Sequence, residues 1–231
     1  MSLITPPENY GFNTLEEKLA YREAADSGRD AAALLIGQLL EKTHTAATHD
    51  KLTGLLNRSG LDEALNFLPI NPDEVNYVVV SADIKNFKLI NDTLGHNVGD
   101  KALRATGQAF AFAFRQRDIV ARTGGDEFVA VAHTGFHAND KYHRHGGLTA
   151  EQQSQSIGSR IDEVMRVVIE RYNKELGITD DKVKFGFSTG FSVWTPSNQG
   201  FDEAVAAADA QMYVNKRAQG DSLRPNNSEL E

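Results

Sequence analysis

The sequence predicts an α+β fold with a central, mostly antiparallel sheet, helices that flank it, and an N-terminal helical extension. Helical and strand-like segments are mixed along the 231 residues and do not alternate as regular βα units. The stretch DIVARTGGDEFVAVA (118–132) has two runs of β character around a Gly-Gly turn, which is typical of a hairpin. Strands joined by so short a turn are antiparallel, which favours this type of sheet.

Residues 1–48 are predicted to be a leader followed by a helical segment for signalling or dimerisation. Residues 1–13 contain two prolines and a glycine, and residues 14–48 have helical character with a break at DSGRD. An apolar stripe at helical spacing must pack against the main domain or against a second copy of the chain. The leucines of this stripe are Leu15, Leu19, Leu34, Leu35, Leu39 and Leu40.

Residues 49–220 are predicted to form the compact domain, and residues 221–231 a disordered tail. The pattern of apolar residues and turn residues divides the domain into helices, strands and one long polar loop. In chain order we first expect a buried strand at 75–84, a short helix at 86–95 that Gly95 ends, and a longer helix at 99–117. The hairpin arms follow at 118–122 and 127–132, and a polar loop at 133–156. The last elements are an amphipathic helix at 160–176, a strand pair or one bent strand at 182–194, and a final helix at 201–219.

Composition excludes several classes of protein. The net charge of −8 argues against broad electrostatic binding to nucleic acid or to an anionic membrane. The chain has no cysteine, which rules out disulfides and thiolate zinc sites and fits a reducing, cytoplasmic location. The longest apolar runs are too short to span a bilayer, and the first residues lack a signal-peptide core.

Three acids mark the candidate site. Asp83 ends the first buried strand, and Asp126 and Glu127 follow the hairpin turn. If the hairpin pairs beside that strand, about 4.8 Å away, the carboxylates converge and repel one another, and Mg²⁺ would remove the repulsion. Gly124 and Gly125 have no side chains, so a phosphate could approach their backbone. The alternative interpretation is an ordinary Gly-Gly turn with solvated acids.

The sequence also resembles the GGDEF-type diguanylate cyclases in several long motifs that occur in the family's order. These are DKLTGLLNR (50–58), FKLINDTLGHNVGD (87–100), GGDEF (124–128), FSTG (187–190) and ADAQMYVNK (208–216). The resemblance covers about residues 50–216 and implies the palm-like nucleotide cyclase (GGDEF) fold. No GxxxxGK[ST] loop is present, so the chain is not a P-loop NTPase.

The resemblance implies that the protein joins two GTP molecules into cyclic di-GMP and releases two pyrophosphates. A homodimer is needed, because each half holds one GTP and the 3′-hydroxyl of one attacks the α-phosphate of the other. The implied cofactor is Mg²⁺ (or Mn²⁺), and phosphoryl transfer needs little beyond positioning and charge neutralisation. The implied metal ligands are Asp83, the Ile84 carbonyl and Asp126, with Glu127 as a further ligand or as the base.

Residues of the motifs at 87–100 and 208–216 are implied to bind GTP. Asp100 and Asn91 would read the guanine edge, since a carboxylate can accept from N1–H and the 2-amino group. Phe87 and Lys88 resemble the family's phosphate-side pair, and Lys88 and Lys216 would contact the triphosphate. Without the family match these residues have ordinary interpretations: a helix N-terminal charge, a turn residue and solvated lysines.

RQRD (115–118) fits the RxxD pattern at the family's spacing from the GGDEF motif, which implies a product-inhibition site. Arg115 would hold a phosphate or stack on guanine, and Asp118 would accept from the guanine edge. Four histidines, His133, His137, His143 and His145, are close together in the sequence, but their spacing fits no zinc pattern, so a solvated insertion is the better interpretation.

Two departures from the family pattern keep a second function open. Lys85 stands where the family often has another acid, and Asp221 stands where a phosphate-binding arginine is usual, although Arg217 is nearby. The alternative is therefore a catalytically weak or inactive GGDEF domain that acts as a GTP or cyclic di-GMP receptor. The complete acid set at 83, 126 and 127 opposes that alternative.

Overall fold

The structure is a computed structural model that describes residues 31–68, 77–133, 150–180 and 183–218. The chain divides into two compact units, Met1–Ala47 and Thr48–Glu231. In the first unit, helix α2 (Ala31–Thr48) lies within the predicted helical segment, and residues 14–30 of that prediction lie outside the described residues. Leu39 and Leu40 of the predicted apolar stripe are both exposed, so part of this stripe is available for packing against another surface.

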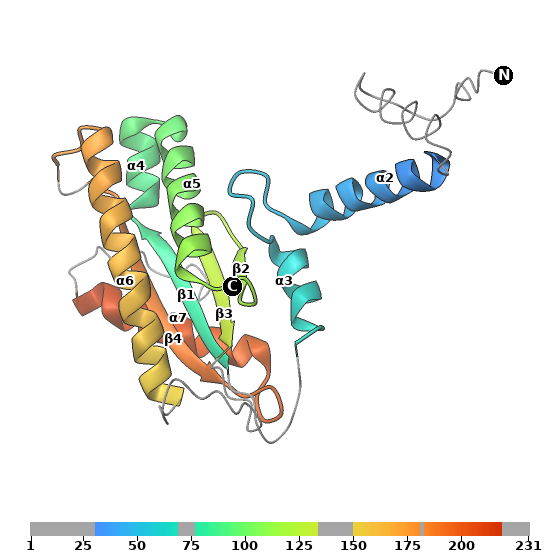
Figure 1. The fold of residues 1–231 in the computed structure, drawn as a ribbon. Helices are drawn as coiled ribbons and strands as arrows, with labels where there is room; N and C mark the ends of the chain where they lie inside the picture. The colour runs from blue at the N-terminus through green and yellow to red at the C-terminus, as the bar shows by residue number, and fades with distance from the viewer. Residues whose placement is uncertain (1–30, 69–76, 134–149, 181–182, 219–231) are drawn as a thin grey trace, which may run out of the picture. The chain divides into compact units, whose positions relative to one another are not determined.

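A four-stranded antiparallel sheet forms the centre of the second unit (Figure 1). Its strands are β1 (Tyr77–Lys85), β2 (Ile119–Arg122), β3 (Glu127–His133) and β4 (Gly186–Trp194), in the order β2-β3-β1-β4. Strand β1 pairs with β3 on one side and with β4 on the other, both antiparallel. The predicted antiparallel sheet is confirmed, and the segment at 182–194 forms one strand and not a strand pair.

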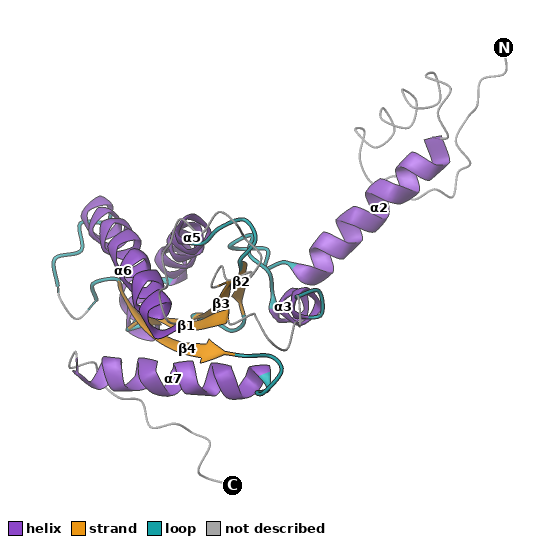
Figure 2. Cartoon of the chain, turned by 60° about the horizontal axis from the view of Figure 1, so that its bottom comes forward, coloured by secondary structure: helices purple, strands orange, loops and turns teal. Residues whose placement is uncertain are grey.

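Helices cover both faces of the sheet, because alternate residues of β1 are apolar on both sides (Figure 2). Val78 and Val80 pack in one cluster with α5 (His96–Ala113) and α6 (Ala150–Glu175), while Tyr77 and Val79 pack in the other. That second cluster includes residues of α3 (Arg58–Leu65) and α7 (Phe201–Ala218). The short helix α4 (Phe87–Leu94) follows β1 and ends at Gly95, as predicted.

Two predicted boundaries are wrong. The loop expected at 133–156 is too long, because α6 already begins at Ala150; residues 134–149 lie outside the described residues. In the segment AEQQSQS, Gln152, Gln155 and Ser156 are exposed, which accounts for their polarity, and the alanine, glutamate and glutamines are good helix formers. The helix expected at 99–117 begins at His96 and ends at Ala113, because Phe114 turns to extended geometry and is buried in the core.

Candidate functional site

The structure brings the three predicted acids to one end of the sheet. Asp83 of β1 is the register partner of Glu127 of β3, and the Ile84 amide donates to the Asp126 carbonyl over 3.3 Å. Asp83 and Asp126 are partly buried, and Glu127 is exposed. We call Asp83, Asp126 and Glu127 the acidic edge. The hairpin therefore pairs beside the first strand, which is the condition the sequence argument set.

Arg122, at the end of β2, holds the turn that carries the acidic edge. Its Nε and one terminal nitrogen donate to the Gly125 carbonyl at 3.2 and 2.7 Å, and its other terminal nitrogen lies 3.0 Å from both carboxylate oxygens of Asp50. Thr53 also donates to Asp50, from its amide and its hydroxyl. Burial alone would raise the pKa of Asp50, but the hydrogen bonds from Thr53 and Arg122 outweigh it and lower that pKa.

Sequence reasoning missed the role of Asp50 and Arg122. Asp50 is the first residue of the motif DKLTGLLNR, which the sequence analysis used only as a resemblance. Its place as the first residue of the family motif was the available signal, but nothing local paired it with an arginine 72 residues later. The motif at 50–58 thus has a structural function here: Asp50 braces the hairpin turn through an ion pair in which one Arg122 nitrogen contacts both carboxylate oxygens.

The two glycines of the hairpin turn, Gly124 and Gly125, differ in how much room a side chain would have. Within the described residues, the glycines with positive φ are Gly54, Gly95 and Gly177, so neither Gly124 nor Gly125 is needed for a left-handed conformation. A side chain at Gly124 would meet the carboxylate of Glu127, whereas a side chain at Gly125 would point into open space. Gly124 therefore makes room for Glu127, and the space beside Gly125 is open to a ligand.

Asp83 is paired with Lys216, a residue of α7. The Lys216 Nζ lies 2.7 Å from the Asp83 Oδ1, and the two side chains are 24% and 20% exposed. Ser188, the register partner of Asp83 on β4, and Ser81 have buried hydroxyls for which the described residues provide no hydrogen-bond partner. In the described part of the chain, no three Asp, Glu or His side chains lie close enough to hold an ion.

The acidic edge nevertheless fits a divalent cation chemically. Carboxylate and carbonyl oxygens from two adjacent strands are the hard donors that Mg²⁺ or Mn²⁺ prefers, and water can complete the shell. The buried Ser188 hydroxyl beside Asp83 is a polar group for which the described chain supplies no partner, as expected where a ligand or its water belongs.

The predicted phosphate-side residues begin α4, directly after β1. Lys88 is exposed, while Phe87 is partly buried and packs against the core, so its ring also has a structural role. Asn86, between β1 and α4, has a φ of 55°. Among the non-glycine residues in the described ranges, it alone has a positive φ. Such strained conformations are frequent at functional sites, and sequence reasoning did not single out this residue.

The predicted guanine-reading residues lie at the contact between α4 and α5. A side chain at Gly99, the buried residue next to Asp100, would collide with the amide oxygen of Asn91, so the two helices approach closely here. Asn91 and Asp100 are both partly buried. Asn91 on α4 thus lies against the turn of α5 that contains Gly99, the residue before Asp100.

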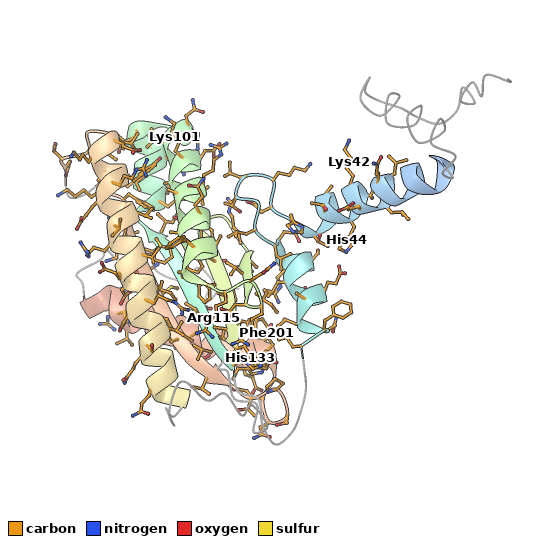
Figure 3. The ribbon with its side chains drawn as sticks, in the orientation of Figure 1. Lys42, His44, Lys101, Arg115, His133 and Phe201 are labelled. Atoms are coloured by element: carbon orange, nitrogen blue, oxygen red, sulfur yellow. The ribbon has the colours of Figure 1, made fainter. Side chains whose placement is uncertain are left out.

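The structure gives the predicted inhibitory residues a structural role that the sequence did not suggest. The Asp118 Oδ2 accepts from the Arg115 amide at 2.8 Å, and its Oδ1 accepts from the His133 amide at 3.2 Å. The Arg115 side chain is exposed, and the His133 ring packs edge-on against Tyr77. Figure 3 shows the side chains of Arg115 and His133. We call residues 115–118 the Arg115–Asp118 bend. The other histidines of the predicted loop lie outside the described residues.

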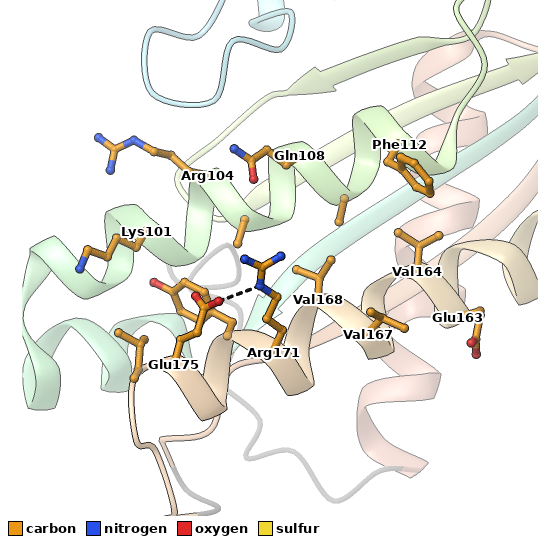
Figure 4. Close-up of a pocket in the computed structure, with 14 residues that line it drawn as sticks. Lys101, Arg104, Gln108, Phe112, Glu163, Val164, Val167, Val168, Arg171 and Glu175 are labelled. Atoms are coloured by element: carbon orange, nitrogen blue, oxygen red, sulfur yellow. Dashed lines mark hydrogen bonds and ion pairs between the residues drawn. The ribbon is translucent and has the colours of Figure 1, made fainter.

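A groove of about 820 Å³ lies between α5 and α6, in the helix layer that covers one face of the sheet (Figure 4). Lys101 and Arg104 line one end, and Phe112 and Val167 line the other. Tyr172 in its wall donates to the Val98 carbonyl, and burial raises the pKa of Tyr172 to about 12. The groove contains none of the predicted site residues.

Comparison with known proteins gives consistent matches in sequence and in fold. The sequence profile of the family described as "Diguanylate cyclase, GGDEF domain" matches residues 47–222. The chain is 31% identical over 191 residues to the diguanylate cyclase DgcP of Escherichia coli K12, covering 82% of this chain and 48% of DgcP. It is 30% identical over 183 residues to the signaling protein YkoW of Bacillus subtilis, covering 76% of this chain and 20% of YkoW. The chain thus spans about half or less of these relatives.

The fold also matches solved structures. The coiled coil and GGDEF domain of DgcB from Caulobacter crescentus, crystallised in complex with c-di-GMP, aligns with a TM-score of 0.63 at 24% identity, over 85% of this chain and 94% of that one. The GGDEF domain of DgcB alone, also with c-di-GMP, aligns with a TM-score of 0.56 at 25% identity, over 74% and 91%. No helix in the described ranges is long and apolar enough to cross a membrane. The profile match over most of the chain shows that this protein belongs to the GGDEF diguanylate cyclase family.

Proposed function

We propose that the protein is a diguanylate cyclase that condenses two GTP molecules into cyclic di-GMP and two pyrophosphates. The observation that carries the proposal is the register pairing of Asp83 with Glu127, which puts the acidic edge at one end of the sheet in a member of this family. Relatives with the same domain are named diguanylate cyclases or were crystallised with c-di-GMP. As a GTP-using enzyme, the protein would act in the cytoplasm.

A divalent cation, Mg²⁺ or Mn²⁺, would neutralise phosphate charge when it is bound at the acidic edge. The residues proposed to hold it are Asp83, Ile84 through its carbonyl, Asp126 and Glu127. Glu127 is exposed at the end of β3, where it can also accept the proton of the attacking 3′-hydroxyl. The turn beside Gly125 has open space in which a phosphate can approach the backbone.

The remaining roles concern substrate binding and positioning. Lys88 and Lys216 would contact the triphosphate as point charges, and Phe87 would support the start of α4 that presents Lys88. Asp100 and Asn91 would read guanine from the corner between α4 and α5. A carboxylate that accepts from the guanine N1–H and 2-amino group disfavours adenine, which lacks donors at those positions.

Two further parts of the proposal concern assembly and control. One GTP per subunit requires a homodimer, and the segment at 1–48, with its exposed leucines in α2, is the proposed dimerisation and signalling element. Cyclic di-GMP would inhibit the enzyme by binding at Arg115 and Asp118. Light scattering on a chain that lacks residues 1–48 tests the first part, since an unchanged dimer would contradict it.

The test of catalysis is incubation of the purified protein with GTP and Mg²⁺, followed by chromatographic separation of the nucleotides. We expect a cyclic dinucleotide that disappears with Asp126→Asn and persists with Asp62→Asn. Asp62 is a suitable control, because it is a half-exposed acid on α3 that pairs with Arg58 and lies outside the acidic edge. Equal product from both variants would contradict the proposed role of Asp126.

The ion pair between Lys216 and Asp83 favours a second candidate, a receptor that binds GTP or cyclic di-GMP without turnover. A lysine that stays on the metal-binding carboxylate would block catalysis, and Lys85 is a second lysine at the same end of β1. GTP binding without any cyclic product in the assay above would favour the receptor over the enzyme.

A further inference from the structure

Lys216 binds the carboxylate to which the proposed function assigns the metal. Its ammonium lies 2.7 Å from the Asp83 Oδ1, and about three quarters or more of each side chain is shielded from solvent. An ammonium and a divalent cation on the same carboxylate repel each other strongly where water is partly excluded. A metal that binds Asp83 therefore competes with Lys216 for this carboxylate.

The backbone from which Lys216 extends is fixed on the sheet. Helix α7 lies so close to β4 that a side chain at Gly190 would collide with the backbone of Ala208 and Met212. One residue before Lys216, the side-chain amide of Asn215 donates from its Nδ2 to the Thr189 carbonyl at 2.9 Å. The ammonium can therefore leave Asp83 by rotation of the flexible lysine stem while the helix stays in place.

We propose that Lys216 is an exchangeable counter-cation that couples metal binding to nucleotide binding. Without ligands, it neutralises Asp83; when a metal–nucleotide complex arrives, the metal takes Asp83 and the ammonium moves to the phosphates. This inference rests on the proposed function, since it assumes a metal at the acidic edge and a triphosphate beside Gly125. The exchange keeps both the carboxylate and the ammonium paired, which matters because an unpaired charge in a shielded place is costly.

The exchange makes a specific thermodynamic prediction. A metal that binds alone displaces Lys216 and offers the ammonium no new anion, so it binds weakly. A metal that arrives with a triphosphate supplies that anion, so each ligand increases the affinity for the other, and by the same factor. Two lysines, Lys88 and Lys216, are assigned to the triphosphate, and Lys216 also binds the proposed metal ligand Asp83. Lys88 is exposed on α4 and has no described ion pair.

The experiment measures Mn²⁺ binding by electron paramagnetic resonance, with and without a non-hydrolysable GTP analogue, so it does not depend on turnover. Lys216→Met should bind Mn²⁺ alone about fivefold or more tightly than wild type, and the analogue should increase Mn²⁺ affinity less in this variant than in wild type. Lys216→Arg keeps the positive charge and should bind Mn²⁺ alone as weakly as wild type. Lys174→Met, which removes an exposed lysine on α6, is the matched control. It should change neither the affinity for Mn²⁺ alone nor the increase in that affinity caused by the analogue.

The outcomes separate this inference from the proposed function. If wild type binds Mn²⁺ with the analogue, and Asp83→Asn abolishes that binding, the metal site stands. If Lys216→Met then binds Mn²⁺ alone no better than wild type, the exchange is overturned while the proposed function survives. If wild type with the analogue binds no Mn²⁺ at the acidic edge, both the exchange and the proposed function are overturned. Thermal unfolding of each variant shows that it is folded during the measurement.

Discussion

The acidic edge and the Arg115–Asp118 bend adjoin the same hairpin, and each contains acidic residues that the family motifs mark as functional. They differ in which residue holds the backbone. At the acidic edge, Arg122 binds the Gly125 carbonyl and is itself held by Asp50, so two residues outside the acidic edge fix the turn. In the bend, Asp118 itself accepts from two backbone amides and so fixes the local structure.

The difference teaches how a motif acid can be assigned. An acid whose local structure is maintained by other residues can be replaced with little effect on folding, so a loss of activity reports on chemistry. An acid that accepts backbone hydrogen bonds has a structural role first, and any ligand must share its oxygens. The following variants test whether the two regions differ in this way.

The largest expected effect is on turnover at the acidic edge. Asp83→Asn should lower the rate of cyclic di-GMP formation by about 100-fold or more, because it removes a charge proposed to hold the metal at the reacting phosphate. The same variant should change the free energy of unfolding by less than about 1 kcal/mol, since the flexible stem of Lys216 lets its ammonium turn to solvent when the partner charge is removed. Steady-state turnover and chemical denaturation measure the two quantities. A large loss of stability would contradict the contrast between the regions.

The next effect is on stability, at the bend. Asp118→Ala should lower the free energy of unfolding by about 1.5–3 kcal/mol, because the amides of Arg115 and His133 lose a charged acceptor. Asp118→Asn keeps one acceptor oxygen and should cost less. Urea denaturation should show that the free energy of unfolding decreases in the order wild type, Asp118→Asn, Asp118→Ala. If Asp118→Ala were as stable as wild type, Asp118 would have no structural role, and the comparison would fail.

The brace behind the acidic edge should contribute a smaller, pH-dependent stability. Asp50→Asn should cost about 1–2 kcal/mol at neutral pH, because it weakens the ion pair to Arg122 and the bonds from Thr53. The pKa of Asp50 is below its ordinary value of 3.8 in the folded protein, so its contribution is complete above that value and is lost as the pH falls through the folded pKa. Denaturation at several pH values should show the difference between wild type and variant shrink below pH 3.8. A difference that grew at low pH would contradict the assignment.

Local periodicity explains why much of the fold was predictable. The valines of β1, the Gly-Gly turn and Gly95 each specify structure through their neighbours, so the sheet, the hairpin and the end of α4 were predicted correctly. The pairing of Asp83 with Glu127 was a condition of the sequence prediction and not a consequence of it, because a hairpin alone does not determine which of its strands lies beside β1. The start of α6 was missed because the sequence argument treated a polar, exposed helical turn as a loop.

The contacts that give the site its properties were not predictable from local patterns. Asp50 meets Arg122, and Lys216 meets Asp83 across 133 residues, and neither pairing has a spacing that could indicate it. The sequence placed Asp50 and Lys216 in motifs and Asp83 in the candidate site, but it gave Arg122 no role and assigned Lys216 to the triphosphate only. Tertiary packing of α7 on β4, which Gly190 allows, brings the lysine to the acid. Motifs therefore indicate which residues matter, and the fold determines what they bind before a ligand arrives.

The smallest expected effect on stability is at Arg115, and it makes this residue the better probe of product inhibition. Its side chain is exposed and has no hydrogen bond to any described residue, whereas its backbone makes the contact with Asp118. Arg115→Ala keeps that backbone contact, so the free energy of unfolding should change by less than about 0.5 kcal/mol.

If cyclic di-GMP binds at the bend, this variant should bind the product several-fold more weakly and should lose less activity as product accumulates. Calorimetry with cyclic di-GMP measures the affinity, and Arg117→Ala, an exposed arginine of the same bend, is the matched control. Unchanged affinity in Arg115→Ala would remove the bend from the regulation of the enzyme and leave Asp118 with its structural role alone.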